Sequence, residues 1–144
     1  MKAILFAAAL AVTGLPACAA PVAERQKPVT ISNDPGGDIA EYVARRQKLA
    51  ASGRPVVIRG KCYSSCTILI TLPNACLDPK AVIGFHQPSA GNGRGMPLLN
   101  PLIAHYYRNG ILDMWNRKWS RSTRLAKISA KDYVRLDPQT RLCR

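Results

Sequence analysis

The sequence predicts an α/β protein with a small, mainly parallel sheet flanked by helices. Short apolar runs typical of strands alternate with longer stretches in which apolar residues recur at helical spacing. Segments rich in glycine, proline and asparagine separate these runs and predict turns. Strands that alternate with helices usually pair in parallel, because each helix carries the chain back to the same end of the sheet. We therefore expect one compact sheet.

The predicted elements follow one another from residue 28 to residue 144, which we interpret as a single domain. Strands are expected at 29–31, 55–58 and 81–85, and helices at 39–50, 64–72, 98–119 and from 130 onward. Ser52-Gly53 is expected to close the first helix, and Ser129 to cap the last one. Residues 21–27 are polar and proline-flanked, and we expect an N-terminal arm there.

The first twenty residues predict a secretory signal peptide. Lys2 supplies the positive start, residues 3–15 are an almost unbroken apolar run, and residues 16–20 are small in the manner of a cleavage site. The run is too short for a membrane span. We therefore expect an exported, periplasmic protein. Cleavage before Cys18, giving a lipoprotein anchored through that cysteine, and a buried N-terminal helix are the alternatives.

Four cysteines follow the predicted signal peptide: Cys62, Cys66, Cys76 and Cys143. An even number in an exported protein predicts two disulfides, and four cysteines allow three connectivities. We expect Cys66 to pair with Cys76, which would join the segment after Ser64 to the run leading into the third strand. Cys62 and Cys143 then form the second pair. Free cysteines are the alternative, and the spacing does not match a usual zinc site.

The chain is strongly basic, with a formal net charge of +13. From Arg108 onward, ten lysines and arginines face only Asp113, Asp132 and Asp137. Such a surplus attracts polyanions, such as an anionic envelope surface, although a solvated basic face is the more common explanation. The sequence holds no recognisable nucleic-acid motif. It also lacks the phosphate-binding loop of an ATPase.

Three short motifs contain the residues from which a hydrolytic site is usually built. They are Asn-Asp-Pro-Gly-Gly at 33–37, Gly-Lys-Cys-Tyr-Ser-Ser-Cys at 60–66 and Gly-Phe-His-Gln-Pro at 84–88. Gly37 precedes a predicted helix, so its N–H is unpaired and can bind an oxyanion. By itself, a Pro-Gly-Gly segment of this kind is more often only a turn.

Ser64 and His86 are the candidate nucleophile and base. Ser64 begins a predicted helix, whose positive end favours negative charge nearby, and the N–H of Ser65 is a second oxyanion donor. Simple helix capping by Ser64, and Ser65 as a rival nucleophile, are alternatives. His86 leaves the end of a strand, where a neutral imidazole can accept a serine proton. Its alternative is a histidine satisfied by backbone groups, and His105 reads as an ordinary helix residue.

In combination, the three motifs resemble those of the Clp protease proteolytic subunit and its relatives in the Clp-protease/crotonase fold. They are more similar to the exported Clp-protease-like proteins of bacteria, which carry cysteines around the serine motif. The resemblance covers residues 28–90 and implies a shortened fold of this type. It also implies that Ser64 is the nucleophile, His86 the base, and Gly37 and Ser65 the oxyanion donors of a serine peptidase that needs no cofactor or metal.

The third catalytic residue of that family, an aspartate, has no counterpart here. Its expected position lies shortly before the helix that begins near Ser129, and residues 119–128 contain no acid. Asp113, Asp132, Asp137 and Asn116 are the substitutes that the chain offers.

The sequence is therefore compatible with three functions. The first is an exported serine hydrolase acting on peptides or proteins. The second is a catalytically inactive Clp-like binding or scaffold protein of the cell envelope. The third is a polyanion-binding protein that uses Arg117, Lys118, Arg121 and Arg124. The helix expected at 98–119 offers Tyr106, Tyr107 and Trp115 to one side of a cleft or to the core. A sheet shortened relative to the family would expose an edge, which the N-terminal arm, the C-terminal helix or a second subunit of a homo-oligomer would cover.

Overall fold

The computed structural model describes residues 26–144. The expected signal peptide at 1–20, including Cys18, and most of the expected arm at 21–27 lie outside the described residues. The strands are β1 (Val29–Asp34), β2 (Val56–Tyr63), β3 (Ala75–Leu77), β4 (Val82–Phe85) and β5 (Ala126–Ser129). The helices are α1 (Ile39–Ser52), α2 (Asn100–Ala104), α3 (Asn109–Arg117) and α4 (Ala130–Leu136), with 3₁₀ segments η1 (Ser64–Leu69), η2 (Pro97–Leu99) and η3 (Trp119–Arg121).

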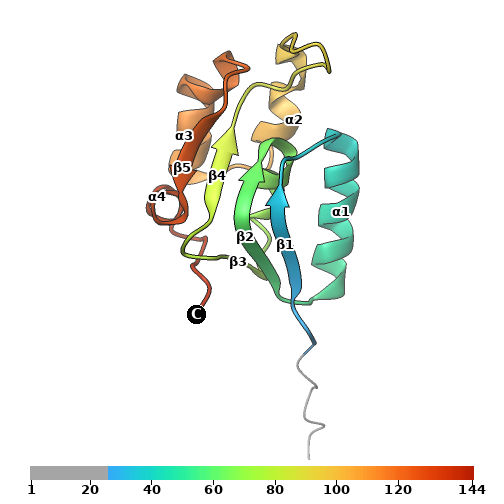
Figure 1. Ribbon diagram of the computed structural model, residues 1–144, viewed down its shortest axis with the longest axis vertical. Coiled ribbons are helices and arrows are strands. Elements are labelled where there is room, and N and C mark those ends of the chain that lie inside the picture. The colour runs from blue at the N-terminus through green and yellow to red at the C-terminus, as the bar shows by residue number, and fades with distance from the viewer. Residues whose placement is uncertain (1–25) are drawn as a thin grey trace, which may run out of the picture.

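The strands form one mixed five-stranded sheet. β1, β2 and β4 lie side by side in that order and run parallel (Figure 1). β5 runs antiparallel to β4, and β3 pairs in parallel with the first residues of β2. The α/β class is confirmed, but the expectation of a mainly parallel sheet is corrected by β5. That strand leaves little trace in the sequence, because its four residues, Ala-Lys-Ile-Ser, lie in a basic stretch without an apolar run.

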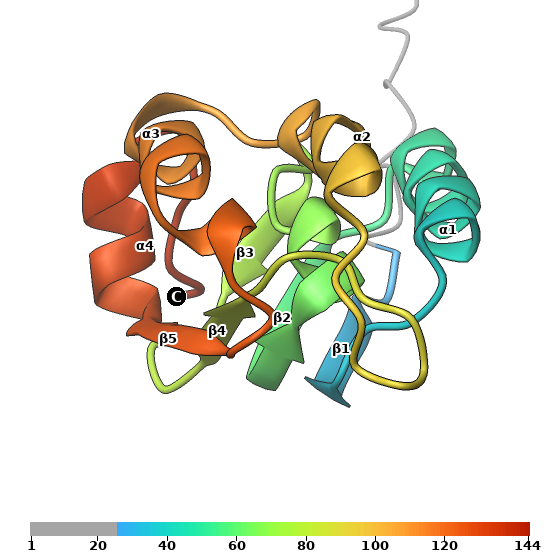
Figure 2. The same cartoon turned by 90° about the horizontal axis from the view of Figure 1, so that it is seen from above.

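The helices cover one face of the sheet, and Figure 2 shows the opposite face without a covering layer. Ile31, Ile58 and Ile83 point from three neighbouring strands into the helix-covered core and are buried. Residues that alternate with them, such as Thr30 and Lys61, are exposed. Strands with one buried face alternate in this way because successive side chains point to opposite sides. The fold therefore leaves one sheet face open.

The first and last helices lie where the sequence predicts them. The Asp38 side chain accepts a hydrogen bond from the N–H of Glu41 at 3.1 Å and caps α1. Gly53 ends α1 with a φ of +63°, a conformation that glycine adopts without strain. Ser129 caps α4 by accepting from the N–H of Asp132 at 3.1 Å. Both caps follow from side chains close in sequence, which makes them predictable.

The prediction of a single long helix at 98–119 is wrong. The segment is divided into η2, α2, α3 and η3, with the main break before α3. Arg108 has extended backbone angles, with φ −147° and ψ 165°. Its side chain and that of Asn109 both bond to the buried carboxylate of Asp137, far along the chain. This tertiary contact accompanies the break, and the amphipathic spacing alone does not reveal it.

The second strand and the segment after it also differ from expectation. The strand expected at 55–58 continues past Gly60 (φ +64°), where the β1–β2 register shifts. The Asn33 side chain accepts a hydrogen bond from the N–H of Lys61 at this irregularity. The helix expected at 64–72 is instead the short 3₁₀ segment η1. The serine motif therefore sits directly at the end of a strand.

The disulfides join Cys62 to Cys66 and Cys76 to Cys143. The expected pairs, Cys66 with Cys76 and Cys62 with Cys143, are wrong. Cys62 lies in the part of β2 that pairs with β4, one residue before the strand ends, and η1 begins after Tyr63 and contains Cys66. Cys76 lies on β3 near the other end of β2. The C-terminal tail reaches that strand, where the Cys143 N–H donates to the Leu77 carbonyl at 2.8 Å.

Two disulfides are typical of a protein that leaves the reducing cytoplasm. The pairing leaves none of the four cysteines after residue 25 as a free thiol. Among the helices of residues 26–144, none is both long enough and apolar enough to cross a membrane.

Candidate functional site

The three motifs meet at one edge of the sheet. β1, β2 and β4 are parallel neighbours, so their carboxyl ends lie at the same edge, at the top of Figure 1. Asp34 is in register with Cys62, and Tyr63 is in register with Gly84. Adjacent strands lie about 4.8 Å apart. The segments that follow each strand are therefore close in space although they are distant in sequence.

Gly36 brings the first motif against the second. A Cβ atom at Gly36 would lie 2.6 Å from the Tyr63 carbonyl oxygen, 2.7 Å from the Ser64 Cβ and 2.9 Å from the Ser65 nitrogen. Gly36 also has a φ of +84°. Only glycine combines this backbone conformation with so close an approach. The glycine of the first motif is therefore required by its contact with the serine segment.

Two backbone donors at this edge have no acceptor. Within the described residues, neither the Gly37 N–H nor the Ser65 N–H donates a hydrogen bond. Gly37 is exposed and directly precedes the capping residue of α1. Backbone N–H groups without an acceptor are of the kind that can bind an incoming oxygen. Both predicted oxyanion donors are thus unpaired within residues 26–144.

Ser64 has an unusual backbone conformation, with a φ of +53°. A non-glycine residue in the left-handed region costs free energy, and such residues collect at functional sites. The structure does not support capping as the role of Ser64. The residue before η1 is Tyr63, which has no side-chain cap, and Ser64 Oγ makes no hydrogen bond within residues 26–144. Ser64 as a whole is only partly buried.

Ser65 is placed differently from Ser64. Its side chain is buried, with 1% of the residue exposed. Its hydroxyl donates a hydrogen bond to the Gly37 carbonyl at 2.7 Å. This bond joins the two motifs and turns the Gly37 peptide so that its carbonyl faces Ser65. The Ser65 side chain therefore acts as a structural tie, and of the two serines Ser64 has the available hydroxyl.

His86 leaves the end of β4, which pairs with β2, the strand that directly precedes Ser64. Its Nδ1 lies 2.7 Å from the carbonyl oxygen of Gln87. A carbonyl only accepts hydrogen bonds, so this contact places the proton of the neutral ring on Nδ1 and leaves Nε2 unprotonated. No hydrogen bond joins His86 to Ser64. The tautomer is the one that a general base requires.

The chain supplies no acid to His86. Asp113 and Asn116 are exposed on α3, and Asp132 hydrogen-bonds Ser129 at the start of α4. Asp137 is occupied by a different cluster. No hydrogen bond within residues 26–144 links any of these four side chains to His86. The hydrogen-bond acceptor at His86 Nδ1 is the neutral carbonyl of Gln87, where a Ser-His-Asp triad would have an aspartate.

Asp34, within the first motif, has a supporting role that the sequence analysis missed. Its carboxylate accepts hydrogen bonds from the Gly36 N–H at 2.9 Å, from the Tyr42 hydroxyl and from Arg45 at 2.9 Å. Burial, together with the neighbouring carboxylate, raises the pKa of Tyr42 to about 12. Aspartate commonly bonds to the backbone two residues later in turns, and that pattern was the available signal. Asp34 therefore fixes the turn that presents Gly37.

Asp137 anchors the helices of the C-terminal half. It is fully buried and accepts from Arg108 Nε at 2.9 Å, from Asn109 at 2.7 Å and from the Thr140 hydroxyl at 2.6 Å. Burial by itself would raise the pKa of Asp137, but the hydrogen bonds from Arg108, Thr140 and Asn109 outweigh it and hold the pKa below its usual value. This acid is structural.

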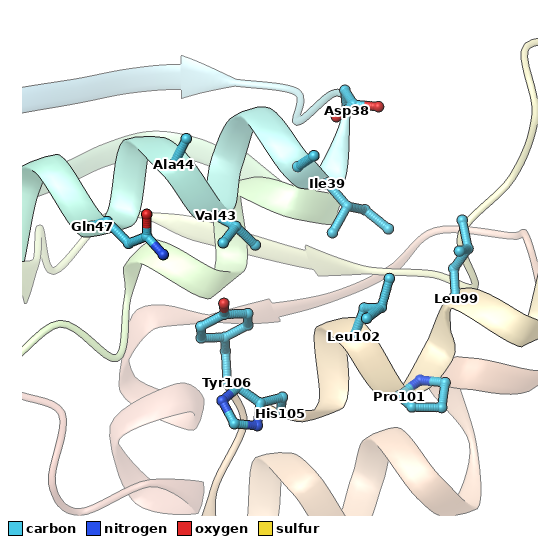
Figure 3. A pocket seen from close by; sticks show the side chains of 11 residues that line it. Asp38, Ile39, Val43, Ala44, Gln47, Leu99, Pro101, Leu102, His105 and Tyr106 are labelled. Carbon is cyan, nitrogen blue, oxygen red and sulfur yellow. The ribbon is translucent and has the colours of Figure 1, made fainter.

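A largely apolar groove with a volume of about 850 Å³ opens between α1 and α2 (Figure 3). It is lined by Asp38, Ile39, Ala40, Val43, Ala44 and Gln47 from α1 and by Leu99, Pro101, Leu102, His105 and Tyr106 from the opposite side. Asp38 directly follows Gly37, so the groove begins beside the free N–H groups. Of the aromatic residues predicted near a cleft, Tyr106 lines this groove, whereas Tyr107 and Trp115 are buried in the core.

The basic residues of the C-terminal half lie on the surface. Arg117, Lys118, Arg121 and Arg124 are all exposed. Within the described part of the chain, no three His, Cys, Asp or Glu side chains come close enough to share a metal ion. The candidate site consists of the Ser64 hydroxyl, the His86 imidazole and the N–H groups of Gly37 and Ser65. The chain matches none of the family models and none of the curated proteins with which it was compared.

Proposed function

We propose that this protein is an exported, periplasmic serine peptidase or related hydrolase with a shortened Clp-protease-like, crotonase-type fold. The observation that carries the proposal is the pair of free N–H groups at Gly37 and Ser65 beside the unbonded hydroxyl of Ser64. These groups come from separate motifs, and the close approach of Gly36 brings them together. The arrangement suits an oxyanion that forms when a carbonyl is attacked.

The reaction would be an acyl transfer. Ser64 Oγ attacks the substrate carbonyl while His86 Nε2 takes the hydroxyl proton, and the N–H groups of Gly37 and Ser65 hold the oxyanion. His86 then returns the proton to the leaving amine or alcohol, and water releases the acyl group by the same steps. Catalytic hydrogen bonds are often long in the absence of substrate, which is consistent with the missing Ser64–His86 bond.

The Gln87 carbonyl would orient His86 in place of an aspartate. A carbonyl fixes the same tautomer, but it does not carry the negative charge that stabilises an imidazolium. Loss of the aspartate in a serine triad lowers the rate by about 10⁴-fold, mainly through the wrong tautomer. We therefore expect a slow enzyme that still forms a covalent adduct with an activated reagent.

The groove between α1 and α2 would receive an apolar part of the substrate. Ile39, Val43 and Leu102 line it, and it begins at the residue after Gly37. A substrate whose carbonyl oxygen binds the Gly37 N–H can therefore place an adjoining apolar group against α1. Burial of such a group contributes about 25 cal/mol for each Å² removed from water.

Labelling with a fluorophosphonate tests the proposal, because this reagent phosphonylates an activated serine. We expect the oxidised, folded protein to be labelled, Ser64→Ala to abolish labelling, and His86→Ala to slow it by about 100-fold or more. Ser65→Ala should still be labelled, since its backbone N–H remains. Absence of labelling in a folded, oxidised sample would instead support the alternative, an inactive Clp-like binding or scaffold protein of the envelope.

A further inference from the structure

The open face of the sheet carries a basic strip beside the candidate site. Side chains on this face alternate with the buried ones, so Lys61 and Tyr63 on β2 point outward together with Lys127 on β5. Both lysines are exposed, and no helix lies over this face (Figure 2). Tyr63 directly precedes Ser64. We define Lys61, Tyr63 and Lys127 as the basic strip.

The strip is held in place by close packing across β4. Tyr63 and Lys127 are both in register with Gly84, one on each side of that strand. A Cβ atom at Gly84 would lie 2.5 Å from Tyr63 Cδ1 and 2.8 Å from Leu125 Cδ1, so the tyrosine ring rests on the glycine backbone. Lys127 Nζ lies 5.7 Å from the centre of the Tyr63 ring. Gly84 thus creates the space that lets the aromatic ring and the ammonium group meet.

The two lysines of the strip have no acidic partner. Within residues 26–144, neither Lys61 nor Lys127 forms an ion pair, whereas Arg59 on the same face pairs with Asp78 at 3.4 Å. The uncharged side chains of Thr30, Ser32 and Val57 occupy the rest of β1 and the start of β2. Positive charge without a partner is therefore concentrated at the end of the face nearest Ser64.

We propose that the basic strip binds an acidic peptide segment of the substrate next to the scissile bond. Same-side side chains recur about every 6.6 Å along an extended chain, and Lys61 and Tyr63 have this same spacing along β2. Lys127 Nζ lies beside the Tyr63 ring, so two acidic side chains that are two residues apart in an extended peptide can reach Lys61 and Lys127, and the residue between them points away from the face. This inference deepens the proposed hydrolase function and depends on it for calling the peptide a substrate.

A peptide fits the face better than a membrane does. A bilayer surface would contact the whole open face, including the uncharged side chains of β1, and would gain from cations across all of it. Here the cations without partners lie in a narrow strip close to the catalytic residues. An extended peptide bound at that strip would have its backbone within reach of Ser64, because Tyr63 is the preceding residue.

Binding can be tested separately from catalysis with Ser64→Ala, which cannot cleave the peptide. The probe is a fluorescein-labelled peptide in which glutamate alternates with leucine, and its counterpart has glutamine in place of glutamate. Fluorescence anisotropy should show salt-dependent binding of the glutamate peptide only. Lys61→Gln with Lys127→Gln should weaken this binding by about 10-fold. Lys48→Gln with Lys131→Gln, at exposed positions of α1 and α4, removes the same charge and should leave it nearly unchanged.

Equal loss in the two double variants would overturn the proposal, because binding would then follow net charge alone. Binding of vesicles that contain phosphatidylglycerol without competition from the peptide would also overturn it in favour of a membrane surface. Fluorophosphonate labelling of the protein with an intact Ser64 distinguishes the two hypotheses. Labelling without peptide binding would support the hydrolase function and contradict the role of the basic strip. Peptide binding without labelling would support the role of the basic strip and contradict the hydrolase function.

Discussion

The sheet edge that carries Ser64 and the cluster around Asp137 differ in the hydrogen bonding of their polar groups. At the serine edge, the N–H groups of Gly37 and Ser65 and the hydroxyl of Ser64 have no partner within the described residues. At the cluster, the carboxylate of Asp137 accepts hydrogen bonds from three side chains. These unpaired groups at the serine edge are the ones to which the proposed function assigns an incoming substrate oxygen.

The comparison also explains why an acid in the C-terminal half is not catalytic. Asp137 is buried and fully used by Arg108, Asn109 and Thr140. Moving it toward His86 would leave the Arg108 guanidinium without its carboxylate partner. The protein thus uses its buried acid for stability and leaves the histidine with a backbone acceptor. The Asp137 cluster contributes stability, and the serine edge contributes the unpaired groups of the candidate site.

The two disulfides give the largest predicted difference between the regions. Cys76–Cys143 closes a loop of 67 residues, whereas Cys62–Cys66 spans only 4. Because a longer loop restricts the unfolded chain more, replacing both members of the first pair by serine should lower the free energy of unfolding by about 4 kcal/mol. Replacing the second pair by alanine should lower it by about 2 kcal/mol. Urea unfolding of oxidised samples measures both values.

The two disulfides should affect fluorophosphonate labelling in the opposite order from their effect on the free energy of unfolding. The short disulfide brackets Ser64, so its loss should reduce fluorophosphonate labelling of the folded protein more than loss of the long one. Equal labelling of the two folded double variants would show that the short disulfide does not help to position the serine.

Asp137→Asn should be the most destabilising single change in the C-terminal cluster. Amide substitution removes the charge that Arg108 faces, and breaking a buried ion pair costs about 3 kcal/mol at the lower end of its range. The lower end applies because Arg108 keeps contact with water, with 31% of its side chain exposed. Asp113→Asn, an exposed change on α3, is the control and should stay within about 0.5 kcal/mol. Similar urea midpoints for the two variants would contradict the structural role of Asp137.

Lowering the pH should reversibly reproduce part of the destabilisation that we expect for Asp137→Asn. The pKa of Asp137 is lower in the folded protein than in the unfolded chain, so its contribution is present above the unfolded pKa of about 3.9. The contribution is lost as the pH falls through the folded pKa. The urea concentration at the unfolding midpoint should therefore decrease once the pH is below about 4. The fall should be smaller in Asp137→Asn, and parallel curves for the two proteins would exclude this carboxylate as the cause.

Ser64→Gly should give the smallest effect and the only gain in stability. Glycine adopts a φ of +53° without the cost of about 1 kcal/mol that a side chain adds, so the variant should be more stable by about that amount and should not be labelled. Gly53→Ala, at a φ of +63° in the cap of α1, is the matched control and should be destabilised. A destabilised Ser64→Gly would mean that the serine side chain supports the fold.

The sequence was most informative where structure depends on neighbouring residues. The end of α1 at Gly53, the cap at Ser129 and the turn at Gly36-Gly37 are local, and the structure contains all three. The three motifs lie at one edge because β1, β2 and β4 are parallel and end there.

The errors arose where contacts span the chain. The break before α3 accompanies bonds to Asp137, and the pairing of Cys143 depends on where the C-terminal tail meets β3. Neither partner is visible from local spacing. The antiparallel β5 and the Nδ1 contact of His86 with Gln87 likewise require the folded backbone. Sequence reasoning sought a carboxylate for His86 and kept a histidine bonded to backbone groups as the alternative, but it could not identify Gln87 as the acceptor.

The crystal structure of the phosphonylated protein tests the central claim most directly. The account predicts phosphorus bonded to Ser64 Oγ, with the phosphoryl oxygen within about 3.1 Å of the backbone nitrogens of both Gly37 and Ser65. His86 Nε2 should face the position of the departed group. Phosphorus on Ser65, or a phosphoryl oxygen directed away from both nitrogens, would contradict the claim that the three motifs form one oxyanion-binding site.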